Sequence, residues 1–73
     1  MDTITIKIEV EKSEMAFVDK IIKAYEGLAM VTVVGGERGL MKLEVPPSNK
    51  QEILEILDDL ANKVKLKIVE IEK

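Results

Sequence analysis

The residues best suited to bind a charged ligand lie in one glycine-rich turn that contains the chain's single arginine. The segment Gly35-Gly36-Glu37-Arg38-Gly39 separates two stretches that are rich in β-branched and alternating apolar residues. Successive backbone N–H groups in such a turn can surround an anion, and a guanidinium can add paired hydrogen bonds. The alternative is an ordinary hairpin turn in which glycine supplies a positive φ. We therefore treat Gly35, Gly36, Arg38 and Gly39 as possible anion contacts, with a structural turn as the competing interpretation.

Two lysine–glutamate pairs have the residue types needed to exchange a proton. Lys7 and Glu9 lie in one alternating stretch, and Lys42 and Glu44 lie in another. If these stretches are antiparallel neighbours, we expect Glu9 to face Lys42 and Lys7 to face Glu44. On an open sheet face such pairs are solvated cross-strand contacts that contribute about 0.2–1 kcal/mol each. We therefore predict no catalytic residue and no enzymatic activity.

Several ligand classes are disfavoured by composition. The chain has no cysteine, histidine or tryptophan, which excludes disulfides, thiol nucleophiles, thiolate or imidazole metal sites and histidine-based triads. The net charge is −3, and the only aromatic residues are Phe17 and Tyr25. Nucleic-acid binding needs a basic surface or stacking aromatics, so we expect no nucleic-acid partner. Because cysteine and histidine, two of the usual metal-binding side chains, are absent, we also expect no metal, and we expect no cofactor. Tyr25 is expected to pack in the core with its hydroxyl at the rim. Phe17 falls beside the main apolar stripe, where it either widens that stripe or is partly exposed and can face a partner.

Hydrophobic periodicity predicts six elements in one domain that covers residues 1–73. Alternation with period two indicates strands, and apolar residues three or four apart indicate helices. Ser13 is the expected N-cap of the first helix, and Ser48 with Gln51 forms the expected capping box of the second. In chain order the predicted elements are strand 3–10, helix 14–26, strand 29–34, strand 40–45, helix 49–62 and strand 64–71.

This βαββαβ order predicts an α+β fold, the ferredoxin-like sandwich. Right-handed crossovers give a four-stranded antiparallel sheet of order 4-1-3-2 with two helices on one face. The last strand is ambiguous, because continued alternation would bury Glu70. A bulge after Ile68, or an exposed apolar end, would remove that conflict.

Two resemblances accompany this fold. The motifs Tyr25-Glu26-Gly27-Leu28-Ala29, Arg38-Gly39-Leu40 and Val45-Pro46-Pro47 resemble a family of short uncharacterised bacterial proteins known as a domain of unknown function. That resemblance covers nearly the whole chain, implies a bacterial cytoplasmic protein and transfers no catalytic residue. The length and topology also resemble ACT domains, which sense amino acids through a glycine-containing loop after the first strand. Here that loop, Glu11-Lys12-Ser13-Glu14, contains no glycine.

The second strand is expected to form an exposed edge suited to self-association. Residues 29–34 carry no charge or proline, and an unguarded edge of β-branched residues pairs readily with another strand. The residues expected at an oligomer interface are Met30, Thr32, Val34, Leu40, Val69 and Ile71. The sequence thus favours a non-enzymatic module that forms a homo-oligomer, preferably a dimer, or binds a protein partner. The alternative is an ACT-like domain that senses a small molecule.

The sequence also carries signals about cellular setting. The first residues alternate in polarity, unlike a secretory signal, and the longest uncharged run, 27–36, is too short to span a membrane. We therefore expect a cytoplasmic protein without a membrane partner. The bias toward lysine, glutamate and β-branched aliphatic residues is typical of proteins from hyperthermophiles.

Overall fold

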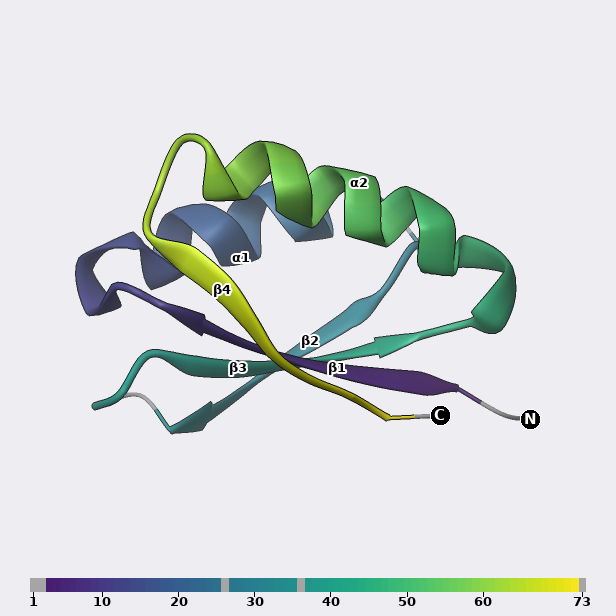
Figure 1. Ribbon diagram of the computed structural model, residues 1–73, viewed down its shortest axis with the longest axis horizontal. Helices are drawn as coiled ribbons and strands as arrows, with labels where there is room; N and C mark the ends of the chain where they lie inside the picture. Colours follow the sequence, from purple (N-terminus) through teal and green to yellow (C-terminus); the bar gives the residue numbers. More distant parts are fainter. Residues whose placement is uncertain (1–2, 26, 36, 73) are drawn as a thin grey trace.

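The protein has two layers, with a sheet of four strands covered on one face by two helices (Figure 1). The computed structural model describes residues 3–25, 27–35 and 37–72. The elements are β1 (Ile4–Val10), the 3-10 turn η1 (Lys12–Glu14), α1 (Met15–Lys23), β2 (Met30–Gly35), β3 (Leu40–Val45), the 3-10 turn η2 (Pro47–Asn49), α2 (Lys50–Ala61) and β4 (Leu66–Glu72). This order confirms the predicted ferredoxin-like βαββαβ fold.

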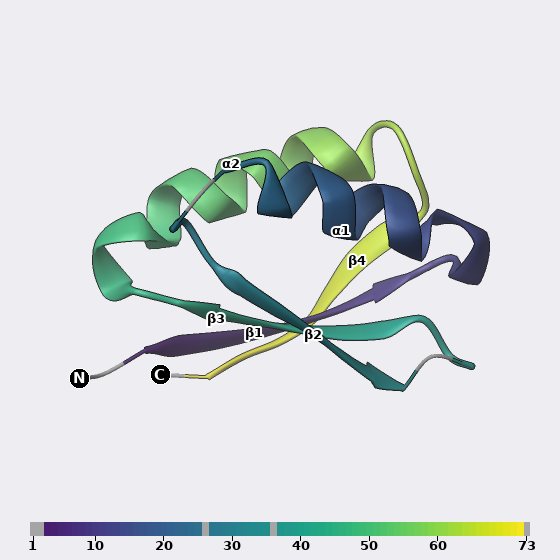
Figure 2. The same ribbon diagram turned by 180° about the vertical axis from the view of Figure 1, so that it is seen from behind.

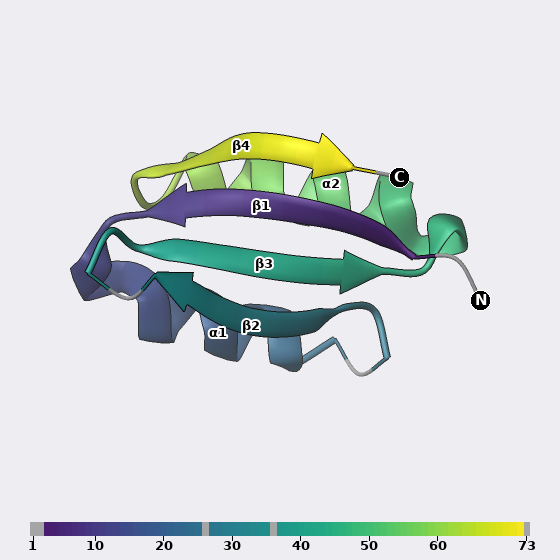
Figure 3. The same ribbon diagram turned by 90° about the horizontal axis from the view of Figure 1, so that it is seen from below.

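The strand order also agrees with the prediction. The sheet reads β2-β3-β1-β4 and every neighbouring pair is antiparallel, which is the predicted 4-1-3-2 read from the other edge. Figures 1 and 2 show α1 and α2 lying side by side on the same face of the sheet. The opposite face carries no helix among the described residues, as the view onto it in Figure 3 shows.

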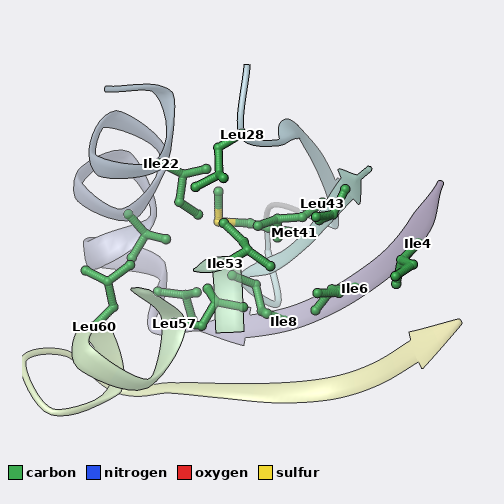
Figure 4. Close-up of a cluster of buried hydrophobic side chains, with 13 residues drawn as sticks. Ile4, Ile6, Ile8, Ile22, Leu28, Met41, Leu43, Ile53, Leu57 and Leu60 are labelled. Carbon is green, nitrogen blue, oxygen red and sulfur yellow. The ribbon is translucent and has the colours of Figure 1, made fainter. Parts of the chain in front are cut away.

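The core lies between the sheet and the helices, and its buried residues are isoleucine, leucine, valine and one methionine, Met41 (Figure 4). Buried and half-buried residues alternate along β1 and β3, because successive side chains in a strand point to opposite faces. From the helices, Val18 and Ile22 of α1 and Ile53, Leu57 and Leu60 of α2 complete the core. These positions are three or four apart, so each helix turns one apolar stripe toward the sheet.

Both predicted helix caps are wrong. Ser13 lies inside η1 and Ser48 lies inside η2, and neither helix start has a side-chain cap hydrogen bond. The chain enters each helix through a 3-10 turn, so the residues directly before α1 and α2 are Glu14 and Asn49. Their ψ values are near zero, whereas a capping side chain needs an extended backbone at that position.

Asn49 forms side-chain hydrogen bonds that the sequence pattern does not predict. Its Nδ2 donates to the carbonyl oxygens of Gly27 and Leu28, at 3.4 and 3.3 Å. These bonds tie the start of α2 to the segment that follows α1, where Gly27 has a φ of +75°. Glycine suits this position, because a residue with a Cβ is strained at such a positive φ.

A bulge in β4 resolves the ambiguity of the last strand. Val69 is an extra residue between Ile68 and Glu70, at the point where the β1–β4 register shifts. The bulge after Ile68 is thus confirmed, and Glu70 stays on the outer face. Beyond the bulge, Ile71 lies opposite the buried Ile6 and turns toward the helix layer. Continued alternation would have placed Ile71 on the outer face, and the bulge moves it to the opposite face.

Candidate functional site

The glycine-rich turn is fixed by a close approach to β1. Gly39 is buried with a φ of +70°, and its carbonyl oxygen accepts a hydrogen bond of 2.8 Å from the Val10 N–H. A Cβ at Gly39 would overlap the Val10 carbonyl oxygen, well inside the 3.0 Å that real Cβ atoms keep. The backbone N–H of Arg38 donates to the Gly35 carbonyl oxygen at 3.1 Å. The Arg38 amide therefore already has a hydrogen-bond partner within the turn. The fourth predicted anion contact, Gly36, lies outside the described residues.

Arg38 lines an open groove of about 590 Å³ at this end of the molecule. Its lining comes from the end of β1, the η1 turn, the β2–β3 hairpin and the segment that leads into β4. The charged lining residues are Lys12, Arg38, Lys65, Lys67, Glu9, Glu11 and Glu37. Lys67 pairs with Glu9, with Nζ and Oε1 3.3 Å apart. Because carboxylates share the groove with the cations, it suits a ligand that carries both charges better than a simple anion.

The outer sheet face has charged pairs, but not the predicted ones. Lys7 lies opposite Lys42 and Glu9 lies opposite Leu40. The Lys7 Nζ is 3.5 Å from Glu70 of β4, and Lys42 pairs with Glu44 on its own strand at 3.4 Å. Alternation did not determine this register, because a shift of two residues keeps every side chain on the same face. Both are partly exposed ion pairs, one between β1 and β4 and the other within β3.

One carboxylate on this face has a perturbed pKa. The hydroxyls of Thr5 and Thr3 donate to Glu44 Oε2 at 3.0 and 3.1 Å. These hydrogen bonds, with a smaller contribution from Lys42, hold the pKa of Glu44 below its ordinary value of 4.5. Glu44 is thereby kept ionised, which does not suit a general acid. Among the described residues, no group of three or more acidic side chains is arranged to hold a metal ion.

The two edges of the sheet differ in how they are protected. The β4 edge carries charged side chains and the bulge at Val69, two devices that discourage strand pairing. The β2 edge has no charge, and Met30, Val33 and Val34 are 70%, 54% and 55% exposed. Its own irregularity, an extra residue at Val34, falls near its end and leaves Met30–Val33 regular.

The predicted interface residues therefore divide into two groups. Met30 and Thr32 lie on the outer face of β2, Val34 occupies the bulge in that strand, and Leu40 follows on β3. These four residues lie on β2, which forms one edge of the sheet, or on its neighbour β3. Val69, like Ile71, lies on β4 at the opposite edge. A single contact surface can include the first group only.

A further groove, of about 430 Å³, lies between α1 and α2. Phe17 and Tyr25 both line it and are 42% and 45% exposed. The prediction that Tyr25 packs in the core is wrong, because its place after the end of α1 leaves the ring at the groove. Neither helix in the described ranges is long and apolar enough to cross a membrane.

These features describe a small ferredoxin-like domain with an exposed strand edge and open grooves at its surface. A family model described as a domain of unknown function, DUF4911, matches residues 8–64, and the chain belongs to that family. The comparison with curated proteins found no match. The comparison with solved structures found none either. The resemblance to an uncharacterised family is thus confirmed, while any activity has to be argued from the site.

Proposed function

We propose that this domain is a non-enzymatic module that joins copies of itself through β2. The observation that carries the proposal is the contrast between the two edges of the sheet. The β4 edge is charged and bulged, whereas β2 presents Met30, Val33 and Val34 to solvent without a guarding charge. An uncovered edge of this kind is an aggregation hazard, and pairing with a second copy removes it.

Two copies can pair antiparallel through β2 about a two-fold axis. The unpaired backbone N–H and C=O groups of each β2 edge then gain hydrogen-bond partners. This pairing joins the two four-stranded sheets into one continuous sheet and leaves the charged outer face in water. Each exposed aliphatic side chain contributes at most ~1.5–3 kcal/mol on complete burial, and each backbone hydrogen bond ~0.5–1.5 kcal/mol. Association costs ~4–15 kcal/mol, so we expect micromolar rather than nanomolar affinity.

Light scattering after size exclusion, at tens of micromolar protein, tests this proposal. We expect a mass of at least twice 8.2 kDa for the natural sequence. Thr32→Lys places a charge in the centre of β2 and should shift the mass toward the monomer. Val69→Lys adds the same charge at the opposite edge and should leave the mass unchanged. A monomer at millimolar concentration, or equal effects of the two variants, would contradict the proposal.

The groove beside Arg38 favours a second function, an ACT-like domain that senses a small molecule. Its volume of about 590 Å³ is in the usual range of ligand sites, and its mixed charges suit a zwitterion such as an amino acid. A thermal-shift screen of amino acids and nucleotides tests this, because a ligand that binds only the folded state raises the melting temperature. No shift with any compound would remove the support for sensing. For either function we propose a bacterial, cytoplasmic setting, which the family resemblance supports.

A further inference from the structure

The groove between the two helices has the features of a protein-docking surface. The helices run antiparallel and side by side over the sheet (Figures 1 and 2). Its aliphatic lining residues are Ile21, Ile56 and Leu60, of which only Leu60 is buried. The groove belongs to the helix layer, whereas the proposed self-association uses an edge of the sheet.

One wall of the groove is aromatic. Phe17 and Ile21 are four residues apart on α1, and Tyr25 follows just after the end of that helix; all three line the α1 side of the groove. Phe17 and Tyr25 are the only aromatic residues in the chain, and both leave more than two fifths of their surface exposed. Aromatic side chains dominate the binding energy of many interfaces. The apolar side chains of a partner would contact the two aromatic rings of this wall, those of Phe17 and Tyr25.

The other wall is acidic. Glu52, Glu55 and Asp59 line the α2 side, and Lys63 is the only cation among the lining residues. Lys63 pairs with Asp59, with Nζ and Oδ2 3.2 Å apart, so the carboxylates of Glu52 and Glu55 give this wall its excess negative charge. A partner that carries lysine or arginine beside its apolar residues would complement this wall.

We propose that this groove binds a basic amphipathic helix of a partner protein. A helix is the matching shape, because a third helix can lay its apolar ridge between two side-by-side helices. The apolar side chains of that helix then lie against Phe17 and Tyr25. The basic residues of that helix then lie against Glu52 and Glu55. This proposal does not depend on self-association through β2.

Fluorescence anisotropy with two labelled synthetic helices tests whether the groove prefers a basic helix to an acidic one. The first is a short amphipathic peptide of leucine and lysine, and the second has glutamate in place of every lysine. We expect the lysine peptide to bind, with an affinity that falls as salt rises, and the glutamate peptide not to bind. Glu55→Lys should weaken binding about three- to tenfold. Asp58→Lys makes the same charge change on α2 outside the groove and should change the affinity less than about twofold.

A second pair of variants tests the aromatic wall. Phe17→Ala should weaken binding of the lysine peptide about tenfold or more, whereas Val33→Ala, at a similarly exposed site on β2, should not. Thermal melting checks that each variant remains folded. Equal binding of both peptides, equal losses for Glu55→Lys and Asp58→Lys, or no binding at millimolar peptide would overturn the proposal. The mass of Glu55→Lys in light scattering should match that of the natural sequence, which separates this outcome from a failure of self-association.

Discussion

Replacement of Gly39 by alanine should cost this domain a large part of its stability. Gly39 has a φ of +70°, a conformation that costs a residue with a Cβ ~1–2 kcal/mol. The added methyl group would also overlap the Val10 carbonyl oxygen. To relieve that overlap the hairpin must move away from β1, which weakens the 2.8 Å hydrogen bond from the Val10 N–H to the Gly39 carbonyl oxygen.

The size of the loss follows from these two contributions. The hydrogen bond is worth a net ~0.5–1.5 kcal/mol, and with the backbone strain the total reaches ~2–4 kcal/mol once the displaced packing is included. A domain of 73 residues has a free energy of unfolding of ~4–11 kcal/mol. Gly39→Ala should therefore remove about a quarter to a half of the stability at the middle of that range.

Gly27 provides a matched control. Its φ is +75°, close to that of Gly39, but a Cβ added there would have nothing within 4 Å. Gly27→Ala should therefore show the backbone strain alone, a loss of ~1 kcal/mol once the lower entropy of the unfolded chain is counted. Urea denaturation followed by circular dichroism, at one fixed protein concentration, measures both variants. Equal losses for the two would show that the close approach of Gly39 to Val10 does not exist.

Two further predictions concern side-chain hydrogen bonds. Asn49→Ala should lower the free energy of unfolding by about 1 kcal/mol in the same urea assay, because it removes both bonds between α2 and the segment after α1. Thr5→Val should raise the pKa of Glu44 toward 4.5 in a carboxylate NMR titration, since Thr5 makes the largest contribution to its lowered pKa. Because the pKa of Glu44 is lower in the folded state, its contribution to stability is present above pH 4.5 and is lost as the pH falls through the folded-state pKa. Thr5→Val should therefore lessen the loss of stability in this acid range, and an unchanged titration would contradict the role of Thr5.

Most of the fold could be predicted from the sequence because its signals are local. Alternation along residues 3–10 and 40–45 marked two strands, and the order of elements with right-handed crossovers determined the sheet. The conflict over burial of Glu70 also led to the bulge that the structure has at Val69. Such features depend on which face of a strand or helix each residue occupies.

The errors came from features that local patterns do not encode. The register of β1 against β3 is one, because Lys7 can face Lys42 or Glu44 without any change of face. The helix starts are another, since a 3-10 turn moves the cap by one residue and leaves Ser13 inside the turn. The grooves were missed altogether, because each is formed by segments far apart in the chain.

The most direct test of the central claim is an isotope-filtered NOE measurement on a mixture of labelled and unlabelled protein. Such a spectrum records only contacts between different copies of the chain. Pairing through β2 should give NOEs from the Met30 and Val33 methyl groups of one copy to β2 protons of the other. Intermolecular NOEs confined to β4 or to the charged outer face, or none at millimolar protein, would contradict assembly through β2.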